Sequence, residues 1–80
     1  MLEKVLLRNL AFNRRVDPDL LMMESAHATR GRLRRLHRRG YRVFVWTVND
    51  REEVERVRSV GVDGIITDYP DRVLGWLQAP

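Results

Sequence analysis

The sequence contains no cysteine, only one lysine and no long apolar run. Without cysteine, neither a disulfide framework nor a thiolate zinc site can form. No apolar stretch approaches the roughly 20 residues that cross a bilayer. Charges at Glu3, Lys4 and Arg8 break the apolar region that a signal peptide would need. We therefore expect a cytoplasmic protein with no membrane span.

Proline and glycine are also sparse, with three and five residues in a chain of 80. No linker, repeat or low-complexity segment divides the chain. The 44% of hydrophobic and 32% of charged residues are typical of a globular protein. A chain of this length buries only about 60–65% of its unfolded surface. Residues 1–80 are therefore predicted to form a single domain with a thin core, or part of a larger one.

Positive charge is unevenly distributed. Of the 15 basic residues, 14 are arginine, and seven of these lie between Arg30 and Arg42. Such a run could make the chain a small basic module that binds phosphate groups or nucleic acid. No aromatic side chain is interleaved from Arg30 to Arg39, and no nucleic-acid-binding motif is present. We favour a solvated helix surface, and nucleic acid is not expected as a partner.

Hydrophobic spacing predicts alternating helices and strands in the first half of the chain. Apolar residues three and four apart indicate an amphipathic helix in residues 1–12 (Leu2, Val5, Leu6 and Leu10), although residues 6–12 could also form a strand. A loop follows around Asp17-Pro18. The apolar run at 20–23 is interpreted as a strand, because small polar residues follow it directly. A helix is predicted from Thr29 to Arg39, ended by Gly40.

The second half gives stronger patterns. Residues 41–48 are almost all β-branched or aromatic, which predicts a strand covered on both faces. Asp50 and Glu53 have the spacing of a capping box for a helix that ends at Gly61. Its predicted buried edge consists of Val54, Val57 and Val60. Residues 61–68 predict a buried strand centred on Ile65 and Ile66. Pro70 then begins a last helix whose inward residues are Val73, Leu74 and Leu77.

This order predicts an α/β fold of up to three consecutive βα units with parallel strands. Such units occur in open sheets and in (β/α)8 barrels of the TIM type. A complete barrel needs roughly 250 residues, so the chain could supply about a third of one. Two sheet edges would then lack a partner strand.

Two motifs carry a specific resemblance. Trp46-Thr47-Val48-Asn49 ends the predicted strand at 41–48, and Gly61-Val62-Asp63-Gly64-Ile65-Ile66-Thr67-Asp68-Tyr69-Pro70 covers the next one. Together with the helix before them, they resemble the C-terminal end of the glycerophosphodiester phosphodiesterase family. The resemblance covers about half of the chain strongly and extends loosely back to residues 16–18. The chain is thus expected to be the C-terminal part of such a barrel or a naturally short member.

Membership of that family implies hydrolysis of glycerophosphodiesters to glycerol phosphate and an alcohol. The family uses a divalent cation, calcium or magnesium, held by carboxylates, and two histidines as general acid and base. Those residues lie in His-Arg-Gly and Glu-x-Asp motifs on early strands, and neither motif occurs in this sequence. We therefore expect no catalytic residue, no metal ligand and no cofactor in this chain, with calcium or magnesium belonging to the complete enzyme.

The residues at the ends of the two predicted strands are the candidate substrate-binding groups. Alternation places Phe44 and Trp46 toward the barrel interior, where Trp46 would form an apolar wall beside the substrate glycerol, or simply fill the core. Asn49 is a polar group at the pocket rim or, alternatively, a helix cap. Thr67 and Asp68 end the last strand at the same rim, where Asp68 could also cap the following helix.

Three polar residues follow the predicted strand at 20–23. Glu24, Ser25 and His27 could bind a metal or exchange protons, but two ligands without a third make a poor site, so solvated loop residues are favoured. His37 is interpreted as a partly buried helix residue.

Unpaired strands also predict assembly. Parallel strands with apolar residues on both faces need other elements to bury those faces. We expect a homo-oligomer, most simply a dimer that pairs strand edges or exchanges the N-terminal helix, or else association with the missing N-terminal barrel portion. A subunit that completes another polypeptide's barrel is a further alternative.

Overall fold

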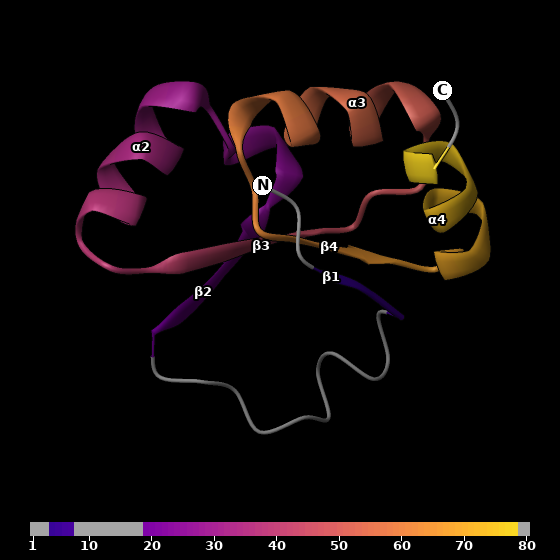
Figure 1. Cartoon of the computed structure of the whole chain (residues 1–80), viewed down its shortest axis with the longest axis horizontal. Coiled ribbons are helices and arrows are strands. Elements are labelled where there is room, and N and C mark those ends of the chain that lie inside the picture. Colours follow the sequence, from indigo (N-terminus) through magenta and orange to yellow (C-terminus); the bar gives the residue numbers. More distant parts are fainter. Residues whose placement is uncertain (1–3, 8–18, 79–80) are drawn as a thin grey trace.

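Every strand pair in the described part of the chain is parallel, as βα units require. The structure is a computed structural model that describes residues 4–7 and 19–78. Its elements are β1 (Lys4–Leu7), β2 (Leu20–Glu24), the 3-10 turn η1 (Ser25–His27), α2 (Arg30–Arg38), β3 (Arg42–Trp46), α3 (Arg51–Val60), β4 (Gly64–Thr67) and α4 (Pro70–Gln78). The strand order is β1-β4-β3-β2, and the three α-helices lie on one side of the sheet (Figure 1).

The predicted helix over residues 1–12 is wrong for Lys4–Leu7, which forms the fourth strand, β1. Lys4 is in register with Gly64 and Leu7 with Thr67, so β1 pairs with an edge of β4 that the prediction left bare. Apolar residues at mixed spacing are compatible with a helix or with a strand. Pairing in a strand also satisfies the backbone donors and acceptors along the edge of β4, which would lack these partners if residues 4–7 were helical. The predicted turn at Asp17-Pro18 lies outside the described residues.

The predicted strands and helices from residue 20 onward are confirmed, but some of their details are not. Gly40 and Gly61 follow their helices with φ of +89° and +96°, a conformation that glycine adopts without strain. Asp50 precedes α3, yet its side chain makes no capping hydrogen bond, so the predicted capping box is wrong. Glu53 binds the Arg56 guanidinium instead.

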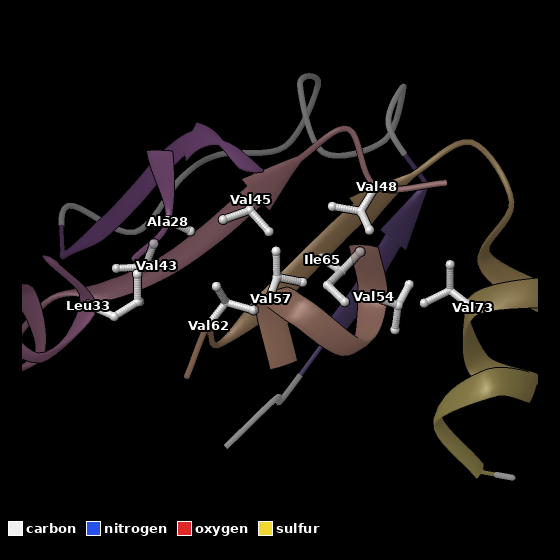
Figure 2. Close-up of a cluster of buried hydrophobic side chains, with 10 residues drawn as sticks. All are labelled: Ala28, Leu33, Val43, Val45, Val48, Val54, Val57, Val62, Ile65 and Val73. Atoms are coloured by element: carbon white, nitrogen blue, oxygen red, sulfur yellow. The ribbon is translucent and has the colours of Figure 1, made fainter. Parts of the chain in front are cut away.

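The two faces of the sheet bury different side chains. Toward the helices, Val43, Val45 and Ile65 pack with residues of α2, α3 and α4 in the cluster drawn in Figure 2. On the opposite face, Phe44 and Ile66 pack with three partly buried residues, Leu20, Met22 and Trp46. This alternation confirms that Phe44 and Trp46 point away from the helix layer.

The last helix, α4, buries less than the sequence pattern suggested. Val73 is fully buried, and Leu77 is partly buried against the helix-side cluster. Leu74, predicted to face inward, is 43% exposed, because only one row of this short helix reaches the sheet. No helix among the described residues combines the length and apolar character that a membrane crossing needs.

Candidate functional site

The carboxyl ends of β3 and β4 lie at the same edge of the sheet, because the two strands are parallel neighbours. Trp46 is the last residue of β3 and Thr67 the last of β4. Trp46 is half-buried on the face that carries Phe44 and Ile66, and its peptide bond to Thr47 is cis. In a closed barrel this face would be the interior and this edge the catalytic rim.

Asn49 connects the two strand ends at this edge. Its Oδ1 accepts hydrogen bonds from Thr67 Oγ1 at 2.8 Å and from the Asp68 backbone N–H at 3.0 Å. Its Nδ2 donates to Asp68 Oδ2 at 3.0 Å. We call Asn49, Thr67 and Asp68 the rim cluster. Asn49 therefore does not cap α3, whose first residue follows Asp50. Its carboxamide is held in one orientation by bonds to β4.

Thr67 is fully buried and anchors the rim cluster to the end of β4. Besides donating to Asn49, its hydroxyl accepts a hydrogen bond from the Tyr69 backbone N–H at 3.0 Å. The turn between β4 and α4 is thus fixed by a side chain of the strand itself. Asp68 is half-exposed and directs its Oδ2 to Asn49.

An open cleft of about 600 Å³ lies beside Asn49. The residues that line it come from the loop after β2, the loop after β3 and the first turns of α3. They are Ser25, Thr47, Asn49, Asp50, Glu52, Glu53 and Arg56. Neither histidine of the chain lines this cleft.

One wall of this cleft is a network around Arg56. Its guanidinium donates to Glu53 Oε1 at 2.8 Å, to the Ala28 carbonyl at 2.9 Å and to the Ser25 carbonyl. The hydrogen bonds from Arg56 hold the pKa of Glu53 below its usual value, although partial burial acts against them. The same bonds raise the pKa of Arg56. The network joins the loop after β2 to α3 and so shapes the cleft.

Glu24 and His27 pair with each other rather than with Ser25. His27 Nε2 lies 3.4 Å from Glu24 Oε2, and both side chains are more than half exposed. Within residues 4–7 and 19–78, no three histidine, aspartate or glutamate side chains converge as a metal site.

His37 and Asp63 meet away from the rim. His37 Nε2 lies 2.7 Å from Asp63 Oδ2, and the same oxygen accepts the Val43 backbone N–H at 2.8 Å. Asp63 also donates its own N–H to the Val43 carbonyl at 2.8 Å. Asp63, only 7% exposed, thus extends the pairing of β3 and β4 and ties α2 to both.

Sequence reasoning did not identify Arg56 or Asp63 as important side chains. The spacing of Glu53 and Arg56, three residues apart on one helix, is a signal for their ion pair. No local pattern indicates that Arg56 reaches the carbonyls of Ser25 and Ala28, because that contact depends on how α3 packs against the loop after β2.

Comparison with known proteins points to one family. The family model described as "Glycerophosphoryl diester phosphodiesterase family" matches residues 5–72. A glycerophosphodiester phosphodiesterase of Caldanaerobacter subterraneus is 49% identical over 35 residues, which are 44% of this chain and 14% of that protein. The human lysophospholipase D GDPD1 is 34% identical over 62 residues, 74% of this chain and 17% of that protein.

A solved structure gives the same result. A Silicibacter pomeroyi protein described as a glycerophosphoryl diester phosphodiesterase superposes with a TM-score of 0.71 at 29% identity, over 91% of this chain and 28% of that one. The chain therefore spans only about a sixth of the length of the curated relatives and little more than a quarter of the solved structure.

Proposed function

The chain belongs to the glycerophosphoryl diester phosphodiesterase family, and from that premise we propose that it supplies the closing strands of a phosphodiesterase barrel. The complete barrel would hydrolyse glycerophosphodiesters to glycerol phosphate and an alcohol, a reaction of lipid and glycerol metabolism. The structural relative supports the α/β architecture of parallel βα units as part of a TIM-type barrel.

The rim cluster is the observation that carries this proposal. Asn49, Thr67 and Asp68 hold together the carboxyl ends of two neighbouring strands, which is where TIM-type barrels build their active sites. Trp46 packs with Phe44 and Ile66 on the sheet face opposite the helices, which would be the interior of the complete barrel. We propose that Trp46 forms an apolar wall beside the substrate glycerol, and that Asn49 fixes the neighbouring loop at the pocket rim.

The catalytic groups would come from outside this chain. The described residues compose no metal site, and the sequence has neither the His-Arg-Gly nor the Glu-x-Asp motif of the family. A calcium or magnesium ion would supply charge stabilisation at the phosphate in the complete enzyme, held by carboxylates of the remaining strands. The chain by itself is expected not to catalyse.

Two sources could supply those strands. The missing N-terminal barrel portion could precede these residues in a longer chain or be a separate subunit, and a second copy could instead cover the same edges in a homo-oligomer. In the described part of the chain, β2 pairs only with β3 and is an edge of the sheet. An edge strand of this kind is a template for another strand.

The test is reconstitution. Two samples are compared: the chain alone, and the chain co-expressed with the Caldanaerobacter relative truncated before the matching segment. Each is incubated with glycerophosphocholine and calcium or magnesium, and the glycerol phosphate that forms is measured. We expect no turnover alone and metal-dependent turnover with the truncated relative. Turnover by the chain alone would contradict the inactivity. Failure of a stable complex to hydrolyse the substrate would contradict the assignment of these strands to the catalytic barrel.

A further inference from the structure

A second concave surface lies between α2 and α3, outside the rim cluster and the cleft beside it. This groove has a volume of about 440 Å³ and is lined by Arg30, Arg34, His37 and Arg38 of α2 and by Ser59, Val60 and Gly61 at the end of α3. We propose that it binds a phosphate group, either of a small phosphorylated molecule or of a lipid headgroup.

The three arginines form one row. Residues four apart on a helix are neighbours, about 6 Å from one another, so Arg30, Arg34 and Arg38 extend over roughly 12 Å. Leu33 is fully buried in the helix-side core and fixes the orientation of α2. The row is therefore held along the groove by packing on the other side of the helix.

These guanidinium groups are available for a ligand. Within residues 4–7 and 19–78, no ion pair or side-chain hydrogen bond engages Arg30, Arg34 or Arg38. Arg32, on the same helix, is different, because it donates to the His27 carbonyl at 2.9 Å. Guanidinium groups present several N–H donors in a plane and bind phosphate through paired hydrogen bonds.

Two carboxylates of the neighbouring elements are engaged by other groups. Asp63 binds His37 and the Val43 backbone N–H, and Glu55, one turn before Ser59 on α3, pairs with Arg51 at 3.5 Å. The carbonyl end of α3 adds partial negative charge, which attracts the arginines but leaves their net positive charge uncompensated. The Ser59 hydroxyl donates to the Arg56 carbonyl, so the arginines are the donors that a phosphate would meet.

The groove favours a single phosphate over a nucleic acid strand. No phenylalanine, tyrosine or tryptophan lines it as a platform on which a base would stack, and its one aromatic ring, His37, is hydrogen-bonded to Asp63. Two guanidinium groups four residues apart on a helix can bind one phosphate together, and Arg30, Arg34 and Arg38 have this spacing on α2.

Backbone amide shifts measured by NMR on the whole chain test this proposal. Inorganic phosphate and glycerol 3-phosphate are the soluble probes, with sulfate and chloride at equal ionic strength for comparison. Vesicles that contain phosphatidic acid, compared with the soluble probes, distinguish a lipid headgroup from a free phosphate, and vesicles of equal charge that contain phosphatidylserine compare a phosphate diester with the terminal monoester. We expect phosphate-dependent shifts at Arg34, Ser59 and Gly61.

Arg34→Gln and Arg35→Gln form the matched pair of variants. Both side chains are exposed on the same helix, and only Arg34 lines the groove. Arg34→Gln should weaken binding about tenfold, the loss of one charge-assisted contact, while Arg35→Gln changes it less than twofold. Equal effects of the two variants, shifts spread over all arginines, or stronger binding of an oligonucleotide than of phosphate at equal salt would overturn the proposal.

Discussion

The Asn49 carboxamide and the Asp68 carboxylate join two strand ends across the rim, with Nδ2 and Oδ2 3.0 Å apart. Asn49 Oδ1 at the same time accepts from Thr67 and from the Asp68 backbone. One side chain thus satisfies three polar groups of β4 and of the turn after it.

Replacing Asn49 by Ala should destabilise the chain by about 2 kcal/mol. The change removes the acceptor of a fully buried hydroxyl and of a backbone N–H, and an unsatisfied buried group costs about 1–3 kcal/mol. Urea unfolding followed by circular dichroism measures the effect. Asp50→Ala is the control, because Asp50 makes no side-chain capping bond, and it should cost less than about 0.5 kcal/mol. Equal losses in the two variants would contradict the role of the rim cluster.

Asp63 and His37 should contribute unequally to stability, although they form one pair. Asp63→Ala leaves the buried Val43 N–H without its side-chain acceptor, so we expect a loss of about 3 kcal/mol. His37→Ala keeps that bond and removes a side chain that is 36% exposed, which should cost about 1 kcal/mol. Urea unfolding of both variants measures the two losses in the free energy of unfolding. A larger loss for His37→Ala than for Asp63→Ala would show that this assignment is wrong.

Glu53 should make stability depend on pH in the acid range. Hydrogen bonds from Arg56 lower its pKa in the folded chain, so its contribution is fully present above the usual glutamate pKa of 4.5 and is lost as pH falls through the lower, folded value. The stability difference between the natural chain and Glu53→Gln should therefore shrink below about pH 4.5. Glu55→Gln is the control, because Glu55 is two-thirds exposed and its pair with Arg51 adds little. A pH-independent difference for Glu53→Gln would contradict the prediction.

Gly64 permits the close approach of the Phe44 ring. A Cβ at position 64 would lie 2.6 Å from ring carbons of Phe44, its partner in register on β3. Gly64→Ala should therefore cost about 1–3 kcal/mol, and Phe44→Leu in the same chain should recover part of that loss. Gly75→Ala is the control, because no atom lies within 4 Å of the new Cβ and α4 gains helix propensity, worth up to about 1 kcal/mol. Unfolding midpoints compare the three variants, and an unchanged midpoint for Gly64→Ala would refute the packing argument.

Features that depend on the residues of one segment could be predicted from the sequence, whereas features that depend on contacts between segments could not. The strand that became β3 is β-branched and aromatic from Val43 to Trp46, and the strand centred on Ile65 and Ile66 is bounded by glycine and proline, so both were predictable. β1 was not, because four residues of mixed spacing become a strand only when β4 offers an edge. The place of Asn49 at the strand end was expected from chain order. Its bonds to Thr67 and Asp68 could not be, since they depend on the register between β3 and β4.

Self-association is the remaining prediction, and it concerns the edge at β2. This strand pairs on one side with β3, and the described residues place no strand on its other side. Exposed backbone donors and acceptors along a parallel sheet edge favour pairing with a further strand. The isolated chain should therefore form a dimer or larger assembly at micromolar concentration, and Lys4–Leu7 would take part in it as a strand, not as part of an exchanged helix.

Sedimentation equilibrium and the concentration dependence of urea unfolding measure this association, because a folded assembly becomes more stable as the chain is concentrated. Leu21→Lys places a charge on the edge strand and should weaken association, as natural edge strands are protected by lysine. Leu74→Lys is the control, since Leu74 is 43% exposed on α4, away from that edge. If Leu74→Lys dissociates the assembly and Leu21→Lys does not, association runs through α4 and not through β2. A monomer that unfolds cooperatively at every concentration would show that β2 needs no partner strand.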